Sequence, residues 1–326
     1  MKVLFNTLII IGLVFLSAES VAQSSKKFKG KKRTSKREIR KRQQDAFERE
    51  EKNAFNPKQP MGSRQNDSRD DLLWHHETAN TVYDGAANIS LVSPSRYGLK
   101  PGLELSSVIP LNYWVPNLFI KKRWQNEKWY VSSKHGFYSA TPGLKWANSN
   151  GYTSVVDQAE QIPFILSMKN EFLLSRLIMD VDRCGRDKPY IIFTGGIGVD
   201  FGVPFDDSDL KEMEGHLLAN RSPAIIGSGY TAYAKGRVDW QVNHLMMLGG
   251  GLKYFYGEFS GRDALEHNLE LQMLVLPRLS LSVGYVFSYA NYVDTKKTAI
   301  FPFLDLTLYL GKRQVRQKGL FGKKMR

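Results

Sequence analysis

The chain has 326 residues, of which 46 are Lys or Arg and 32 are Asp or Glu, so its formal net charge is +14. A single cysteine, Cys184, excludes an intrachain disulfide and the zinc modules that need several cysteines. After the first residues there is no apolar run of about eighteen residues, so the sequence predicts no transmembrane helix.

Residues 1–22 are typical of a secretory signal peptide. Lys2 supplies the positive start, residues 3–16 are almost wholly apolar, and Ser20-Val21-Ala22 places small residues before the expected cleavage site. Cys184 lies far from that site, so a lipid-anchored N-terminus is excluded. We therefore expect export and cleavage.

The positive charge lies in two segments outside the body of the chain. Residues 23–70 hold sixteen basic and seven acidic residues, and residues 312–326 hold seven basic and none acidic. Residues 71–311 are close to neutral. The basic segments are either solvated and disordered or a tether to an anionic surface, for which peptidoglycan or an acidic periplasmic protein is the expected partner. The basic N-terminal segment has no recognisable nucleic-acid-binding fold around it, so we expect no nucleic-acid partner.

The body alternates apolar and polar residues with a period of two, which is typical of strands. In 279–289 the odd positions are all apolar or aromatic, and four of the five even positions are Ser or Gly. Ten or so residues suit a tilted strand that crosses a bilayer. Candidate strands are 78–93, 96–108, 111–124, 127–142, 160–178, 188–203, 224–241, 244–258, 267–277, 279–291 and 298–311.

Strands with one apolar and one polar face cannot lie in hydrocarbon with open edges, so the sheet is expected to close. Long connections alternate with short ones, which predicts that 148–159, 204–223, 259–266 and 292–297 face outside and that both basic segments are periplasmic. A chain starting in the periplasm needs one more strand, for which 70–77 is the only room. The predicted fold is all-β, an antiparallel transmembrane β-barrel of about twelve strands, with ten as the fallback and one helix at 208–219. A soluble antiparallel protein is the alternative.

A series of short motifs resembles exported barrel proteins of Bacteroidota. The resemblance spans most of 78–311 and implies an outer-membrane β-barrel from a largely uncharacterised group, with no catalytic residues to carry over. The chain departs from the usual pattern after Tyr309-Leu310-Gly311, where a basic tail follows the strand that commonly ends such proteins. The motifs are Thr78-Ala79-Asn80-Thr81, Tyr97-Gly98-Leu99, Leu103-Glu104-Leu105, Pro116-Asn117, Lys122 with Trp124, His135-Gly136-Phe137-Tyr138 and Asn170-Glu171.

The strand faces assign a set of polar residues to the lumen. Their mixed charges fit either a solute pore with a transverse field or paired side chains that fill a narrow barrel, and twelve strands lie between filled and open barrels. His75-His76-Glu77 could ligate a metal, but three adjacent loop residues rarely make a closed site. The predicted lumen residues are Lys100, Glu104, Thr194, Asp200, Lys235, Arg237, Asp239, Lys253, Glu270 and Asp305.

These patterns predict a barrel in the outer membrane of a Gram-negative bacterium, with outer-membrane lipid as its surroundings. The first hypothesis is a porin-like pore or small-solute transporter. The second is a sealed structural barrel whose basic segments bind peptidoglycan or an acidic periplasmic partner. We expect no catalytic set, metal or cofactor, and hence no enzyme.

Overall fold

The computed structural model describes residues 73–126, 129–152, 161–179, 189–208, 210, 223–227, 229–243, 245–257, 261–276, 278–292 and 296–311. All of them belong to one compact unit, Pro60–Arg326. The predicted signal peptide, the two basic segments, Cys184 and all but two residues of the predicted helix 208–219 lie outside the described residues.

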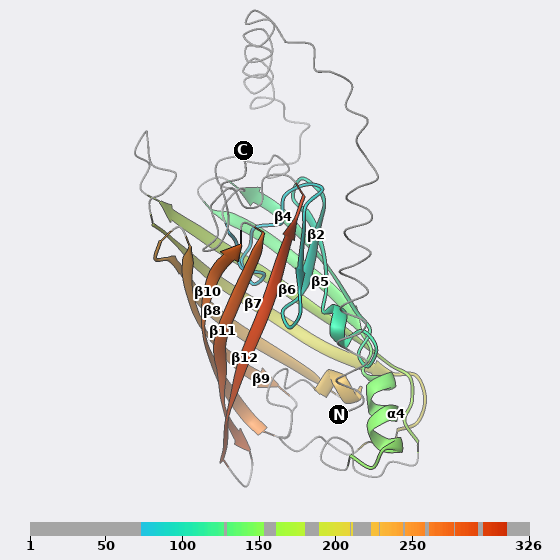
Figure 1. The fold of residues 1–326 in the computed structure, drawn as a ribbon. Helices are drawn as coiled ribbons and strands as arrows, with labels where there is room; N and C mark the ends of the chain where they lie inside the picture. Colours follow the sequence, from blue (N-terminus) through green and yellow to red (C-terminus); the bar gives the residue numbers. More distant parts are fainter. Residues whose placement is uncertain are drawn as a thin grey trace, which may run out of the picture. The chain divides into compact units, whose positions relative to one another are not determined.

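Twelve antiparallel strands form a closed barrel, as predicted (Figure 1). Each strand pairs with the next along the chain, and β12 closes the barrel on β1. The strands are β1 (Ala87–Ser90), β2 (Ser95–Lys100), β3 (Leu103–Ser107), β4 (Asn117–Asn126), β5 (Tyr130–Tyr138), β6 (Ile165–Met179), β7 (Tyr190–Pro204), β8 (Tyr230–Gln241), β9 (Met246–Gly257), β10 (Gly261–Leu276), β11 (Leu279–Tyr292) and β12 (Lys296–Leu310).

Side chains alternate between an apolar outer face and a more polar lumen. On β8, Val238 and Trp240 are exposed, whereas Arg237 and Asp239, which precede each of them, are buried. The same alternation on β6 exposes Phe172 on the outer face. The period of two in the sequence therefore corresponds to an apolar outer face and a charged lumen.

The count of twelve is reached by a different partition from the one predicted. The expected strand 96–108 is a hairpin of β2 and β3, which turns at Gly102 with φ +76°. Such a positive φ suits glycine, which has no Cβ to clash. The expected strand 78–93 shrinks to Ala87–Ser90, and residues 73–77 form no strand. The hairpin thus supplies the strand that had been assigned to 70–77.

Two further boundaries differ from the prediction. The expected strand 127–142 ends at Tyr138 and is followed by helix α4 (Thr141–Ser149), which starts with Pro142 in its first turn and buries Leu144 and Ala147. β10 begins at Gly261 rather than 267, because its pairing with β9 and β11 continues through the polar residues there.

The barrel has two distinguishable ends. The terminal end holds the start of β1 and the end of β12, which pair at Ala87 and Leu310. The loop end holds α4 and two short 3₁₀ helices, η1 (Ile109–Leu111) and η2 (Pro223–Ile226). The longest connections, 139–164 and 205–229, both lie at the loop end. Within the described ranges, every helix is too short or too polar to span a bilayer.

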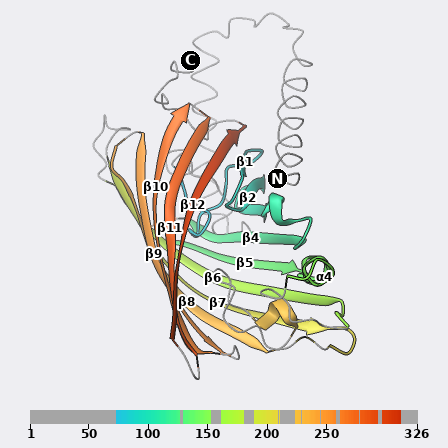
Figure 2. The ribbon, with the colours of Figure 1, turned by 60° about the horizontal axis from the view of Figure 1, so that its bottom comes forward.

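The wall is uneven in height. β1, β2 and β3 have four, six and five residues, whereas β10, β11 and β12 have sixteen, fourteen and fifteen. Figure 2 shows β1 and β2 beside only the terminal-end part of β12. One side of the barrel therefore has a much shorter wall than the other.

Candidate functional site in the barrel lumen

Residues Leu73–Ala86, here called the lumen segment, run inside the barrel ahead of β1. Thr78, Ala79 and Asn80 are fully buried. The side chains that contact this segment come from eight different strands, so the segment is surrounded by the wall. They are Arg96, Glu104, Lys121, Arg123, Tyr130, Ser175, Tyr190, Lys235, Arg237 and Glu270.

One ammonium group binds three carbonyl groups of the segment. Lys121 Nζ donates to the carbonyl oxygens of His76, Thr78 and Asn80, at 3.1, 3.1 and 3.2 Å. Residues 76–79 form a turn and a bend, closed by a hydrogen bond from the Thr78 N–H to the His75 carbonyl at 3.1 Å, and a single cation on β4 reaches all three carbonyls. Lys121 is itself fully buried, and it fixes the middle of the segment.

Other backbone groups in the first part of the segment also bond to wall side chains, whereas Gly85 and Ala86 at its end pair with the Gly98 backbone of β2. The Ala79 N–H donates to Ser175 Oγ at 2.9 Å, and the Val82 N–H donates to Glu104 Oε2 at 2.8 Å. Arg96 donates to the Trp74 carbonyl at 2.7 Å. A buried polar backbone group is costly unless it is paired, and these side chains provide the pairing that a strand neighbour would otherwise give.

A cluster of buried charges on β2, β3 and β4 flanks the segment. Glu104 lies 3.2 Å from Lys121 and 3.8 Å from Arg96, and Arg123 bonds to the Asn80 side chain. All three cations are buried. Removing one partner of such a cluster leaves an uncompensated buried charge, so the segment and the cluster stabilise each other.

A second cluster meets the segment on β8 and β10. Glu77 lies 3.7 Å from Lys235 and 3.5 Å from Arg237. Arg237 also contacts Glu270 at 2.5 Å and Asp239 at 2.8 Å. Glu77 thus adds a negative charge from the lumen segment to a network of ion pairs between wall side chains.

The network continues toward the loop end without the segment. Glu171 accepts hydrogen bonds from Tyr233 at 2.5 Å and from Lys235 at 3.2 Å, and it lies 3.8 Å from Lys134. Lys235 therefore joins Glu171 of the wall to Glu77 of the lumen segment. Opposite charges fill the middle of the lumen.

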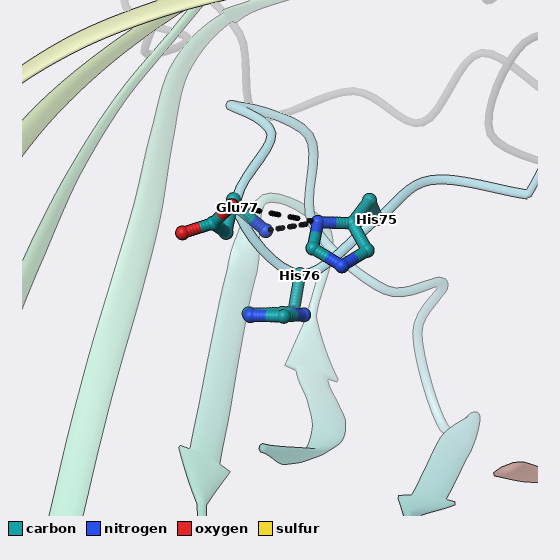
Figure 3. A group of neighbouring side chains, drawn as sticks. All are labelled: His75, His76 and Glu77. Carbon is teal, nitrogen blue, oxygen red and sulfur yellow. Dashed lines mark hydrogen bonds and ion pairs between the residues drawn. The ribbon is translucent and has the colours of Figure 1, made fainter. Parts of the chain in front are cut away.

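His75, His76 and Glu77 stand together near the start of the segment (Figure 3). One potential ligand atom from each lies within 4.8 Å of the others. However, His75 Nε2 contacts Glu270 at 3.2 Å, and Glu77 is already paired with Lys235 and Arg237. Two cations beside the only carboxylate of the three oppose a metal ion, so the geometry favours an ion-pair role.

The electrostatic surroundings shift these three groups. Burial, with Arg237 adding to it, holds the pKa of His75 well below its ordinary value. Burial likewise lowers the pKa of His76, although Glu77 opposes the shift. Burial alone would raise the pKa of Glu77, but the positive charges of Lys235 and Arg237 outweigh it and hold that pKa well below its usual range. The seated segment therefore carries two neutral imidazoles and one carboxylate.

An apolar seat receives the start of the segment. The Trp74 ring lies 4.6 Å from the Tyr130 ring, centroid to centroid. Ala79, Leu173, Tyr190 and Ile192 complete the same buried cluster. Close packing here gives the segment one position as well as stabilisation.

The end of the segment passes directly over Gly98 of β2. A Cβ atom at Gly98 would lie 2.1 Å from the Tyr83 carbonyl oxygen, which no side chain can tolerate without a shift. The absence of a side chain at this position thus lets the segment lie against the wall before it turns into β1.

Little space remains beside the segment at the β1 and β12 side. The cavity there measures about 40 Å³ and is lined by residues that include Trp74, His75, Arg96 and Tyr309. Because a water needs roughly 10–15 Å³ by this measure, the space admits a few waters and excludes a larger solute.

The structure places the predicted lumen residues as follows. Lys235, Arg237, Asp239 and Glu270 form one network, to which Glu104 on β3 does not belong. Lys100 is exposed at the end of β2, beyond a register shift, and does not join them.

The others lie at separate places in the wall. Asp200 accepts a hydrogen bond from Tyr138 at 2.9 Å, and Thr194 contacts Ser175 at 2.7 Å. Lys253 is half-buried, with Nζ 4.4 Å from the Tyr233 ring centroid. Asp305 binds the turn after β1.

Sequence reasoning missed the residues that hold the lumen segment. Lys121 and Arg123 alternate with apolar Ile120 and Trp124, and this pattern could have assigned them to the lumen. Nothing local could have shown that residues 73–86 are their partner, because the contacts between segment and wall span from 22 to 195 positions of sequence.

Comparison with known proteins gives weak structural likenesses. No family model matches the chain, and no curated protein matches it. A solved structure described as a bacterial polysaccharide outer membrane secretin aligns with TM-score 0.38 and 8% identity, over 69% of this chain and 70% of that one. The outer-membrane expressed OmpT of Vibrio cholerae aligns with TM-score 0.33 and 9% identity, over 67% and 64%. A structure from work on in-meso crystallization of membrane proteins gives 0.27 and 9%, over 72% and 91%. At these scores the likenesses carry no inference about function.

Proposed function

We propose that the protein is an outer-membrane β-barrel that its own lumen segment keeps sealed. The outer face supports the membrane location. Exposed apolar side chains such as Phe172, Ile197 and Leu252 cover strands all around the barrel, which in water would be an aggregation hazard and in a bilayer is required. The closed strand order gives every strand two neighbours, which is the arrangement that a spanning sheet needs in lipid, although β1 covers only the last residues of β12.

The proposed orientation puts the terminal end in the periplasm. In bacterial barrels the periplasmic turns are short and the outer loops are long, and the longest connections here are both at the loop end. The N-terminal basic residues 23–70 and the C-terminal basic residues 312–326 then both emerge in the periplasm.

The seal rests on one observation, the fan of three hydrogen bonds from Lys121 to the carbonyl groups of the lumen segment. A segment held by side chains from eight strands obstructs the lumen. In the proposed role the barrel is a non-enzymatic membrane anchor, and the basic residues 23–70 and 312–326 bind peptidoglycan or an acidic periplasmic protein.

Conductance in a planar bilayer tests the seal. The folded, inserted protein should show no discrete current steps. In a Cys184→Ser background, Ala79→Cys with Ser175→Cys would allow a disulfide between segment and wall, because the Ala79 nitrogen lies 2.9 Å from Ser175 Oγ. Steady steps from the unaltered protein, together with the same steps from the oxidised double-cysteine variant, would contradict a lumen sealed by this segment.

Binding to purified peptidoglycan tests the anchor. Deleting residues 24–42 removes most of the positive charge of the N-terminal basic segment, so co-sedimentation should fall while the barrel still inserts. A scrambled segment of the same composition is the control, since it keeps the charge. Unchanged co-sedimentation after deletion of both 24–42 and 312–326 would remove this role.

A porin-like pore that opens when the segment leaves is the second candidate. The observation that favours it is the exposure of Glu77, whose side chain is 24% exposed while Arg237 beside it is 2% exposed. Water can therefore reach the link between segment and β8. If this candidate is right, the oxidised Ala79→Cys, Ser175→Cys variant should show no current, and reduction of its disulfide should produce intermittent current steps.

A further inference from the structure

The edge of β12 is unpaired along much of its length. β12 pairs with β11 without a bulge from Lys296 to Leu308, but it pairs with β1 only from Thr307 to Leu310. One further bond joins the Leu91 N–H to the Leu306 carbonyl at 3.2 Å. From 298 to 304, β12 has a strand neighbour on one side only, as far as the structure describes the chain.

The direction of the unpaired groups follows from two hydrogen bonds. The Leu306 carbonyl accepts from Leu91 on the β1 side, whereas the Tyr309 N–H donates to the Arg278 carbonyl at 2.8 Å on the β11 side. Successive residues of a strand point their backbone groups to opposite sides. Thr298, Ile300 and Leu304 therefore aim their N–H and C=O groups away from β11, toward the open side.

The short wall explains why pairing stops there. The Asp305 carboxylate accepts from the backbone N–H groups of Leu91, Val92 and Ser93 at 3.0, 2.9 and 3.1 Å, and from Ser90 Oγ at 2.5 Å. These bonds hold the turn between β1 and β2 at the level of Asp305. The chain turns back at this point, and no part of β1 reaches Leu304.

A proline marks the same edge. Pro302 has no N–H, and by the alternation above its missing donor would lie on the open side. Proline within a sheet is confined to positions where its nitrogen faces no partner. Pro302 thus agrees with an edge that this chain does not itself pair, and it leaves the β11 ladder intact.

This edge lies in the apolar band of the outer face. Ile300 and Leu304 are 65% and 58% exposed, and they stand opposite Phe287 and Val283 of β11. Phe301, which alternation points to the lumen side, is also 42% exposed. In a bilayer this position offers the unpaired backbone groups no water, so each of them is costly until a partner pairs it.

We propose that residues Thr298–Leu304 of β12 are a docking edge for an extended strand of another polypeptide, which completes the short wall by backbone hydrogen bonding. The proposal goes beyond the sealed barrel and takes from it only the membrane location. A strand supplies alternating donors and acceptors at the required spacing. The seven-residue edge fits a partner strand with apolar side chains on the lipid face. Because Pro302 has no N–H to donate, the partner's carbonyl group at that position receives no hydrogen bond from β12.

Two other occupants fit less well. A lipid tail covers apolar side chains but satisfies no N–H or C=O. A second copy inserted in the membrane with the same orientation would place its β12 parallel to the first. A two-fold axis along the membrane normal would then set each residue of β12 opposite the same residue of the other copy, which is an offset of zero. In a parallel ladder each residue bonds to the residues before and after its neighbour, so residues that face the partner must be offset by an odd number. Symmetric pairing of two β12 edges is therefore excluded.

A peptide of nine alternating Val and Thr residues, with a Lys at each end and a fluorescent label, is the probe. Its binding to the full-length protein in phospholipid nanodiscs would be followed by fluorescence anisotropy. The control is the same peptide with alternate backbone nitrogens methylated along one edge, which keeps the apolar surface and removes the donors. We expect saturable binding of the first peptide, with the methylated peptide at least tenfold weaker.

Two substitutions on the open side move the affinity in opposite directions. Pro302→Val adds a donor there and should strengthen binding about twofold to tenfold, the effect of one backbone hydrogen bond. Ile300→Pro removes a donor from the same side and should weaken binding by a similar factor. Neither change touches a group that bonds to β11, so thermal unfolding should stay close to that of the unaltered protein.

Three results would overturn the proposal. They are equal binding of the methylated peptide, no saturable binding of the unmethylated one, or no response to either substitution in protein that remains folded. Conductance is measured separately, so a barrel that leaks and still binds the peptide would contradict the seal and leave the docking edge standing.

Discussion

Lys121 Nζ lies 3.1 Å from the carbonyl oxygen of Thr78 and so ties wall strand β4 to the lumen segment. The same ammonium contacts Glu104 at 3.2 Å. A backbone that would otherwise have needed a strand neighbour is satisfied here by one side chain.

Lys121→Met should release the lumen segment. It leaves three buried carbonyls without a donor and Glu104 without its nearest cation, which by general estimate costs about 3–5 kcal/mol. Limited proteolysis between residues 73 and 86, and the fluorescence of Trp74, would report the release. Lys122→Met is the matched control, because Lys122 is exposed on the outer face. Equal protection of both variants would deny Lys121 this role.

Gly98→Ala should displace the segment by steric contact. The new Cβ would meet the Tyr83 carbonyl at 2.1 Å, and overpacking of this kind costs about 1–3 kcal/mol. Gly195→Ala is the comparison, since a Cβ there has no neighbour within 4 Å. Denaturation midpoints of the two variants would separate them, and a Gly98→Ala protein as stable as Gly195→Ala would show that the segment does not press on β2.

Acid should loosen the segment before it unfolds the barrel. His75 and His76 have pKa values below the ordinary 6.5 when seated, so the released segment binds protons more readily. Stability of the seated state is complete above about pH 6.5 and falls below it by up to about 1.4 kcal/mol per pH unit for each histidine. Glu77, whose seated pKa is lowered, contributes stability that is lost only below the ordinary carboxyl pKa of 4.5.

The charged groups around the two imidazoles set this response. The carboxylates of Glu270 and Glu77 lie beside His75 and favour its protonated form. The cations Arg237, Lys235 and Arg96 oppose protonation of His75, and Lys134 opposes protonation of His76. Protease sensitivity of the segment should rise between pH 6.5 and 4.5, and His75→Gln with His76→Gln should flatten that rise. A slope that survives both substitutions would assign the effect to other groups.

Reversing the charge of Lys235 or Arg237 should alter ion selectivity if the lumen ever conducts. Both cations face Glu77 and a wall carboxylate, so Lys235→Glu or Arg237→Glu also weakens the hold on the segment. We expect current steps that favour cations more than those of a barrel opened by reducing the disulfide. Reversal potentials in a salt gradient measure this, and identical values would place the two residues outside the ion path.

Amide exchange should alternate along β12. The N–H groups of Thr298, Ile300 and Leu304 point to the open side, whereas those of Ala299, Phe301 and Phe303 point to β11. In detergent solution the first three should exchange much faster than the second three, because only the latter are in a ladder. Nuclear magnetic resonance resolves single amides, and uniform protection would mean that the edge is already covered.

The sequence by itself determined the barrel. Period-two alternation in segments such as 279–289 set which side chains face out. The repetition of such segments indicated eleven strands, and the requirement for a periplasmic start added the twelfth, although the structure forms it as the β2–β3 hairpin and not at 70–77. Alternation is a local property, because successive side chains of any strand point to opposite faces. It therefore placed Arg237, Asp239 and Glu270 on the inner face without knowledge of their partners.

Only the tertiary structure decided what lies inside. The sequence predicts a strand over 78–93, and a local pattern does not tell whether backbone groups bond to another strand or to side chains. Lys121, Ser175 and Glu104 make that choice from 22 to 96 positions away. The open edge of β12 was hidden for the same reason, since Asp305 ends the wall by binding a turn more than 200 positions earlier. Contacts at such separations arise when the barrel closes.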